Sequence, residues 1–199
     1  MKLHYSSAFI VAGLLAALPA RADDGLTRIG QTPAVDCFKA AATISRTGNA
    51  LSDMQRNHAM KNCAQALNGN LLDKDRIATL VNRGTIEAAS GELDSSLADY
   101  DAALSLNPSN ADVYINRGTA FMRGARYEEA RADFDKALSL QPTNSYIAYF
   151  NRGMALEKSG NLTAAYADYK QAVALAPDYQ PAKAELARFQ TVTRPSSHG

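Results

Sequence analysis

The side chains that could carry out chemistry are few in this chain and stand in no catalytic pattern. Its three histidines are His4, His58 and His198. The sequence contains no Gly-x-Ser-x-Gly, no phosphate-binding loop and no His-Glu-x-x-His, so the common signatures of a nucleophile, a phosphate site and a zinc site are missing. We therefore expect a protein that is not an enzyme and has no cofactor and no metal site.

Two Asp-x-Asp pairs are the remaining candidates for acid–base or metal chemistry. They are Asp99 with Asp101 and Asp133 with Asp135. Both lie in segments whose apolar residues recur at helical spacing. Because residues i and i+2 of a helix point in different directions, neither pair is expected to converge on one ion or proton.

Composition excludes several classes of protein. The chain has 199 residues, 46% of them hydrophobic, with 21 Lys and Arg against 20 Asp and Glu. This profile is typical of a globular protein, and the near-zero net charge provides no basic patch for nucleic acid.

The N-terminal segment reads as a signal peptide of residues 1–22. An apolar run over residues 8–18 is too short to span a membrane, and Ala20-Arg21-Ala22 is a small-x-small cleavage pattern. We expect a flexible segment at 23–31, no membrane span in the mature chain, and a secreted protein that resides in the periplasm.

A repeated frame is the strongest signal in the sequence. Asn-Arg-Gly occurs at 82–84, 116–118 and 151–153, in steps of 34 and 35 residues. An aromatic or Leu residue precedes each Gly by four positions, and a small residue, an aromatic residue, Ala and Pro follow at fixed distances. Between 111 and 144 the apolar residues mark two helices around a tight turn at 124–126.

This frame resembles the tetratricopeptide repeat, in which each unit is a helix hairpin. The resemblance implies an all-α, right-handed α-solenoid that ends in a C-terminal capping helix. Its units are expected at residues 77–110, 111–144 and 145–180, with the cap at 181–193 and a flexible tail at 194–199.

A weaker copy of the frame precedes these units, over residues 32–68. Cys37 and Cys63 stand at its two aromatic positions, which lie level with each other in a hairpin of this family. The resemblance therefore implies a Cys37–Cys63 disulfide. Free buried thiols and a redox-active pair are the alternatives; an oxidising compartment disfavours the first, and the absence of Cys-x-x-Cys disfavours the second.

Each clear repeat also carries an Arg before its Gly and an Asp before its second-helix aromatic residue. This co-occurrence predicts one ion pair between the two helices of each hairpin. The predicted pairs are Arg83 with Asp99, Arg117 with Asp133, and Arg152 with Asp168.

In this family the first helix of each hairpin lines a concave groove. Asn82, Asn116 and Asn151 would form a ladder along it, either holding the backbone of an extended peptide or bridging adjacent helices. Both readings remain open. The other expected groove residues are Val81, Thr85, Ile115, Thr119, Met122, Phe150 and Met154.

The resemblance implies a scaffold or adaptor of the cell envelope that binds another protein or an extended peptide. The alternatives are a self-associating structural module and a regulator of an envelope enzyme, and the oligomeric state is open. The family's carboxylate clamp is not expected, since Val81, Thr85, Ile147 and Asn151 stand where the clamp has other residues.

Overall fold

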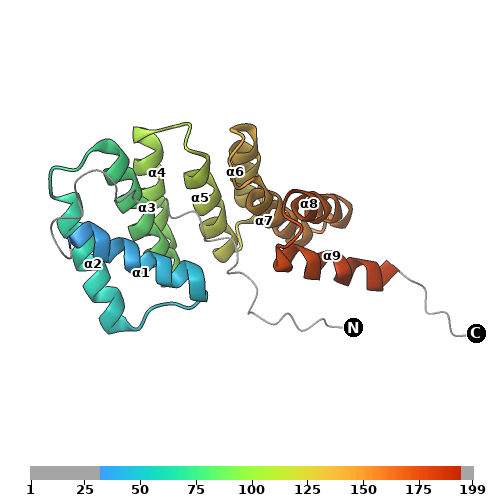
Figure 1. The fold of residues 1–199 in the computed structure, drawn as a ribbon, viewed down its shortest axis with the longest axis horizontal. Coiled ribbons are helices and arrows are strands. Elements are labelled where there is room, and N and C mark those ends of the chain that lie inside the picture. Colours follow the sequence, from blue (N-terminus) through green and yellow to red (C-terminus); the bar gives the residue numbers. More distant parts are fainter. Residues whose placement is uncertain (1–31, 194–199) are drawn as a thin grey trace, which may run out of the picture.

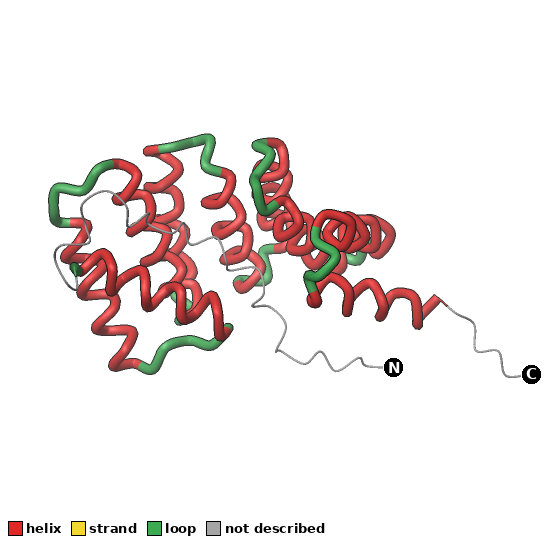
Figure 2. Tube along the Cα trace, viewed as in Figure 1, coloured by secondary structure: helices red, strands yellow, loops and turns green. Residues whose placement is uncertain are grey.

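The computed structural model describes residues 32–193. The predicted signal peptide at 1–22, the predicted flexible segment at 23–31 and the predicted tail at 194–199 lie outside the described residues. Within 32–193 every regular element is an α-helix, and Figure 2 shows these helices joined by loops. None of the helices in this range has the length and apolarity needed to cross a membrane.

The helices form four successive antiparallel hairpins and a single last helix. Their bounds are α1 Pro33–Thr47, α2 Asp53–Leu67, α3 Asp73–Ala89, α4 Leu93–Leu106, α5 Ala111–Arg123, α6 Tyr127–Ser139, α7 Ser145–Lys158, α8 Leu162–Leu175 and α9 Gln180–Thr193. The first clear repeat begins earlier than predicted, at Asp73 rather than 77, because Asp73 and Asp75 favour the N-terminal turn of a helix.

The turn inside each clear hairpin depends on one residue with a positive φ. This residue is Gly91 in α3–α4 (φ 84°), Ala125 in α5–α6 (φ 56°) and Gly160 in α7–α8 (φ 86°). It lies seven positions after the Gly of each Asn-Arg-Gly. Two of the three turns have glycine at this position, and glycine adopts a positive φ without strain.

Inside each of the three clear hairpins an aromatic side chain of the second helix packs on a glycine of the first. A Cβ added to Gly118 would lie 2.7 Å from a ring carbon of Phe134, and one added to Gly153 would lie 2.8 Å from Tyr169. These rings are almost fully buried. The small residue of the frame is therefore required by the close approach of the two helices.

The hairpins stack so that their first helices adjoin one another. α3 packs against α5 and α5 against α7, whereas the described second helices α4, α6 and α8 are not packed on one another to this extent. This arrangement puts α3, α5 and α7 on the inside of a curved stack, an all-α solenoid. We call the surface of α3, α5 and α7 the inner face. In Figure 1 the α7–α8 hairpin is turned relative to α3–α6, as stacking with a twist requires.

The two ends of the stack are closed in different ways. At the first end, Cys37 and Cys63 are joined by a disulfide between α1 and α2, and Ile86 of α3 packs against them. At the other end, α9 covers the last hairpin, with Phe189 5.7 Å from the ring of Tyr169. α1 and α9 lie at opposite ends of the molecule in Figure 1.

Candidate functional site

Three arginines of the first helices bind aspartates of their own hairpins through two hydrogen bonds each. Nε and Nη2 of Arg83 donate to the Asp99 carboxylate at 2.6 and 2.6 Å. The same two nitrogens donate in Arg117–Asp133, at 2.8 and 2.7 Å, and in Arg152–Asp168, at 2.7 and 2.7 Å. These are the residue pairs that the repeat frame predicted. Bidentate geometry fixes the orientation of the two helices.

Two of these arginines also reach the preceding hairpin, which the sequence analysis did not predict. Nη1 of Arg117 donates to Asp101 of α4 at 2.5 Å, and Nη1 of Arg152 donates to Asp135 of α6 at 2.8 Å. The two aspartates of each Asp-x-Asp pair therefore accept hydrogen bonds from arginines of two different hairpins. Their repetition at a spacing of 34 residues was the signal that could have revealed this role.

The shared arginines occur only at the two internal joints of the described solenoid. The position of Asp101 and Asp135 is occupied by Ala64 in α2 and by Lys170 in α8. At the last joint, Glu157 of α7 instead accepts hydrogen bonds from Tyr169, at 2.9 Å, and from Arg188 of α9, at 2.6 Å. The capping helix is thus held by a carboxylate that the repeat frame does not contain.

The three asparagines of the frame lie inside the helix packing. Asn82, Asn116 and Asn151 are 4%, 2% and 4% exposed. Nδ2 of Asn151 donates to Oγ1 of Thr119 at 3.3 Å, which joins α7 to α5. This contact is the helix-bridging role, one of the two readings that the sequence left open.

The remaining predicted groove residues are also mostly covered. Thr85 is buried and shares a hydrogen bond of 3.3 Å with the hydroxyl of Tyr100, and Met154 is half-buried. The other five are buried, namely Val81, Ile115, Thr119, Met122 and Phe150. The structure differs here from the expectation of an open groove, because these side chains fill the spaces between neighbouring first helices and the second helices behind them.

Two basic side chains at the C-terminal ends of first helices were not predicted to have a role. Arg123 and Lys158 each stand seven residues after an asparagine of the frame, at the ends of α5 and α7. Lys158 is exposed and Arg123 is half-buried. Residues seven apart lie on the same side of a helix, so the spacing Asn-x6-Arg or Asn-x6-Lys was the signal available in the sequence.

One buried carboxyl group interrupts the apolar interior of the first clear repeat. Glu87 is 7% exposed, and its Oε2 is inaccessible and has no hydrogen-bond partner. Burial raises the pKa of Glu87 to about 7, with the negative charges of Asp99 and Glu92 acting in the same direction and Arg83 opposing them.

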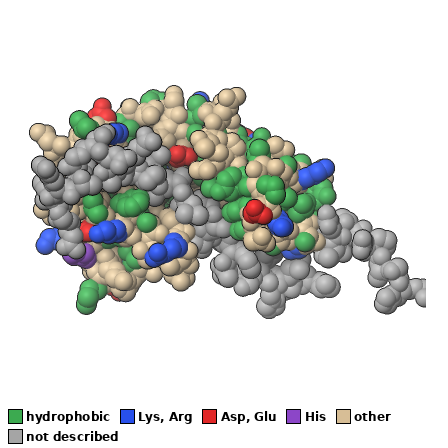
Figure 3. Space-filling view, in the orientation of Figure 1, with side chains coloured by type: hydrophobic (Ala, Val, Ile, Leu, Met, Phe, Trp, Pro, Cys, Tyr) green, Lys and Arg blue, Asp and Glu red, His purple; other side chains and the backbone are tan. Residues whose placement is uncertain are grey.

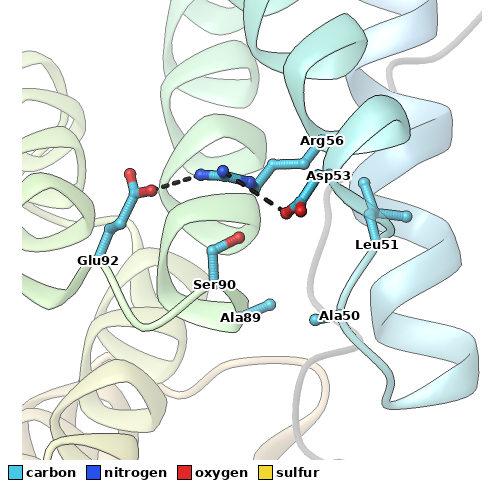
Figure 4. Close-up of a pocket in the computed structure, with 7 residues that line it drawn as sticks. All are labelled: Ala50, Leu51, Asp53, Arg56, Ala89, Ser90 and Glu92. Atoms are coloured by element: carbon cyan, nitrogen blue, oxygen red, sulfur yellow. Dashed lines mark hydrogen bonds and ion pairs between the residues drawn. The ribbon is translucent and has the colours of Figure 1, made fainter.

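A small polar pocket of about 300 Å³ lies between the N-terminal hairpin and the α3–α4 turn. Figure 4 shows Arg56 directed between Glu92 and Asp53, and the corresponding distances are 2.5 and 3.8 Å. The positive charge in this pocket is therefore already paired within the protein. We assign the pocket to the joint between α2 and α3.

Catalytic and metal-binding groups were not expected. His58 is exposed on α2, and His198 lies outside the described residues. Across residues 32–193 no three His, Cys, Asp or Glu side chains are placed to hold a metal ion. Where Figure 3 shows described residues, acidic and basic side chains are interspersed with apolar ones.

Family models for the tetratricopeptide repeat match residues 81–145 and 146–179. A search of curated protein sequences returns no match.

Solved structures with the same fold include domains from distant sources. The TPR domain of Arabidopsis OM64 is 26% identical, with 61% of this chain and 99% of that chain covered and a TM-score of 0.57. The first TPR of Spaghetti (RPAP3), bound to the HSP90 peptide SRMEEVD, is 25% identical, with 62% and 98% covered and a TM-score of 0.56. A thermophilic TPR protein of Thermus thermophilus is 20% identical, with 82% and 84% covered and a TM-score of 0.64, and shows the fold alone.

Proposed function

Because this chain belongs to the tetratricopeptide repeat family, we propose that it is a non-catalytic scaffold that binds a protein partner or an extended peptide on its inner face. The observation that carries the proposal is the alignment of α3, α5 and α7 in one curved layer. A similar TPR domain holds a peptide, which supports this use of the fold.

The structure indicates which side chains such a partner would touch. The asparagines and most apolar residues of the frame are occupied within the packing, so recognition falls to the less buried residues Arg123, Met154 and Lys158. The covered residues hold the first helices in register. They set the spacing of the contact points without contributing much contact area themselves.

We also propose that this scaffold works in the periplasm. The apolar run and cleavage pattern of residues 1–22 support export. The disulfide between Cys37 and Cys63 is consistent with an oxidising compartment.

Affinity capture with residues 23–199 from a periplasmic extract of the source organism tests the binding face. We expect the double variant Met154→Ser/Lys158→Ser to capture at least ten-fold less of the partner than the unsubstituted chain does. The matched control Lys136→Ser/Lys170→Ser, on the second helices, should capture as much as the unsubstituted chain. Equal capture by both variants, with unchanged circular dichroism, would show that the inner face is not the binding surface.

A further inference from the structure

One position of the repeat frame lies at the contact between each hairpin and the next. It stands seven residues before the aromatic position of the second helix, and its occupants are Arg56 in α2, Leu93 in α4, Tyr127 in α6 and Leu162 in α8. Cδ2 of Leu93 lies where a Cβ atom of Gly124 would be, so Leu93 packs directly on the α5–α6 turn. Tyr127 is half-buried, and its neighbour Glu128 accepts a hydrogen bond from Ser159 of the α7–α8 turn. We call this position the joint position.

At the C-terminal end of the described solenoid the joint position has no turn to cover it. Within residues 32–193 α9 has no second helix, and Leu162 is 54% exposed. Tyr166, one helical turn further along α8, is 36% exposed, and its ring lies 6.0 Å from that of Phe189. We call Leu162, Tyr166 and Phe189 the terminal apolar patch. The outer end of a solenoid is ordinarily polar, so this patch indicates a surface that packs on something further.

The same position carries a charge at the N-terminal joint, where a pocket is present. Arg56 pairs with Glu92 along one edge of the pocket between α2 and the α3–α4 turn (Figure 4). Leu51 and Ala89 supply an apolar lining, and the Ser90 hydroxyl already donates to a backbone carbonyl of α3 at 2.9 Å. The volume of about 300 Å³ exceeds that of a leucine side chain. The pocket can therefore accept an apolar side chain without leaving these charges unpaired.

The two ends of the solenoid are complementary in the contact that each lacks. The pocket lies beside a hairpin turn, which is the element that Leu93 contacts inside the chain. The terminal apolar patch presents an apolar joint residue without such a turn. Figure 1 shows α2 and α8 toward opposite ends of the molecule, so the two surfaces of one chain do not meet. Two copies can bring them together, because the patch and the pocket are different surfaces of the same chain.

We propose that the protein self-associates head to tail, with Leu162 of one copy inserted into the pocket beside the α3–α4 turn of the next. The occupant of the patch is a second copy because a turn of this chain is what the joint position contacts at an internal joint. Lys170 is the single charged residue among the exposed residues of α8, so little charge is desolvated by the contact. The inference goes beyond the proposed function, since partner binding on the inner face does not use these surfaces.

Sedimentation velocity of residues 23–199 over a range of concentrations tests the proposal. We expect the weight-average mass to rise from about one chain at ~10 µM to about two chains or more at ~500 µM, since a small contact is weak. Leu162→Asp should stay monomeric, because its carboxylate would lose water beside Asp53 and Glu92 of the pocket. The matched control Leu175→Asp, an exposed leucine at the other end of α8, should associate like the unsubstituted chain.

A mixing experiment tests the two surfaces together. Ala50 is an exposed residue that lines the pocket, so Ala50→Trp should fill the pocket and be monomeric alone. Leu162→Asp retains the pocket and Ala50→Trp retains the patch, so their equimolar mixture should form a heterodimer and no longer chain. Undiminished association of either folded variant, or a mixture without heterodimer, would overturn the proposal. An unsubstituted chain that is monomeric at every concentration would also overturn it and assign the patch to a different protein.

Discussion

Glu87 of α3 occupies a repeat position that is apolar in the next two first helices. The equivalent residues are Phe121 in α5 and Leu156 in α7. Its carboxyl group is buried beside the Arg83–Asp99 pair of the same hairpin, and its pKa is raised to about 7. The folded protein therefore holds an additional proton between the ordinary pKa of a glutamate, near 4.5, and about 7. The contribution of Glu87 to stability is complete below this interval and is lost as the pH rises through it.

We predict that the free energy of unfolding contains a component from Glu87 that falls by about 1 to 3 kcal/mol between pH 5 and pH 8. Glu87→Gln should remove that component, because the amide does not ionise. Urea denaturation at the two pH values measures the difference. Glu92→Gln loses the contact with Arg56 and the smallest of the contributions that raise the pKa of Glu87, so it should retain most of the pH dependence. An unchanged slope in Glu87→Gln would contradict the assignment.

At the scale of residues, the sequence predicted those contacts that lie within one repeat. The Arg–Asp pairs and the Cys37–Cys63 bridge depend on positions inside a single hairpin, which the frame specifies. The contact of Arg117 with Asp101 depends on how two hairpins stack. That relation is set by packing across the joint, so a one-repeat pattern could not provide it. For the same reason the sequence left two roles open for the asparagines, which the structure places inside the helix packing.

At the scale of elements, the turns between the two helices of each clear hairpin share one backbone conformation but not one residue type. Gly91, Ala125 and Gly160 adopt the same left-handed conformation, although only glycine does so without steric cost. A Cβ added to Gly91 would meet no atom within 4 Å. A substitution there therefore tests backbone conformation alone.

Reciprocal substitutions should shift stability in opposite directions. We expect Ala125→Gly to raise the free energy of unfolding by about 0.5 kcal/mol, since relief of strain exceeds the added entropy of the unfolded chain. Gly91→Ala should lower it by about 1 kcal/mol. Chemical denaturation followed by circular dichroism gives both values. Changes of the same sign in the two variants would show that the turn does not control these effects.

Element boundaries were predictable where the frame repeats and less so at its margins. The hairpins α5–α6 and α7–α8 fall within the predicted units, since their turn, small residue and terminal Pro recur in register. α3 begins before its unit, and Asp73 and Asp75 lie in its first turn.

At the scale of the whole molecule, the two ends are fixed by different bonds. The first hairpin has a covalent cross-link, and the last helix depends on Glu157 and Arg188. Each hairpin of a solenoid contacts only its neighbours, so an end can open without the rest.

Removal of the cross-link should therefore loosen one end selectively. For Cys37→Ala/Cys63→Ala we expect a loss of about 3 kcal/mol in the stability of the first hairpin. Hydrogen exchange should speed up in α1 and α2 and stay unchanged in α6 and α9. Reduction of the unsubstituted chain should reproduce this pattern and should have no effect on the double variant. A uniform rise in exchange over all helices would instead indicate one cooperative unit.

The sharing of Arg117 and Arg152 between hairpins bears on how such a chain can lengthen in evolution. Residues 111–144 carry both the arginine that reaches backward and Asp135, which receives the next arginine. A tandem duplication of this segment would reproduce every ion pair at the new joint. Duplication of the last hairpin would not, because Lys170 stands in place of the aspartate. The charge pattern thus favours growth from the middle of the solenoid, with the two specialised ends carried along unchanged.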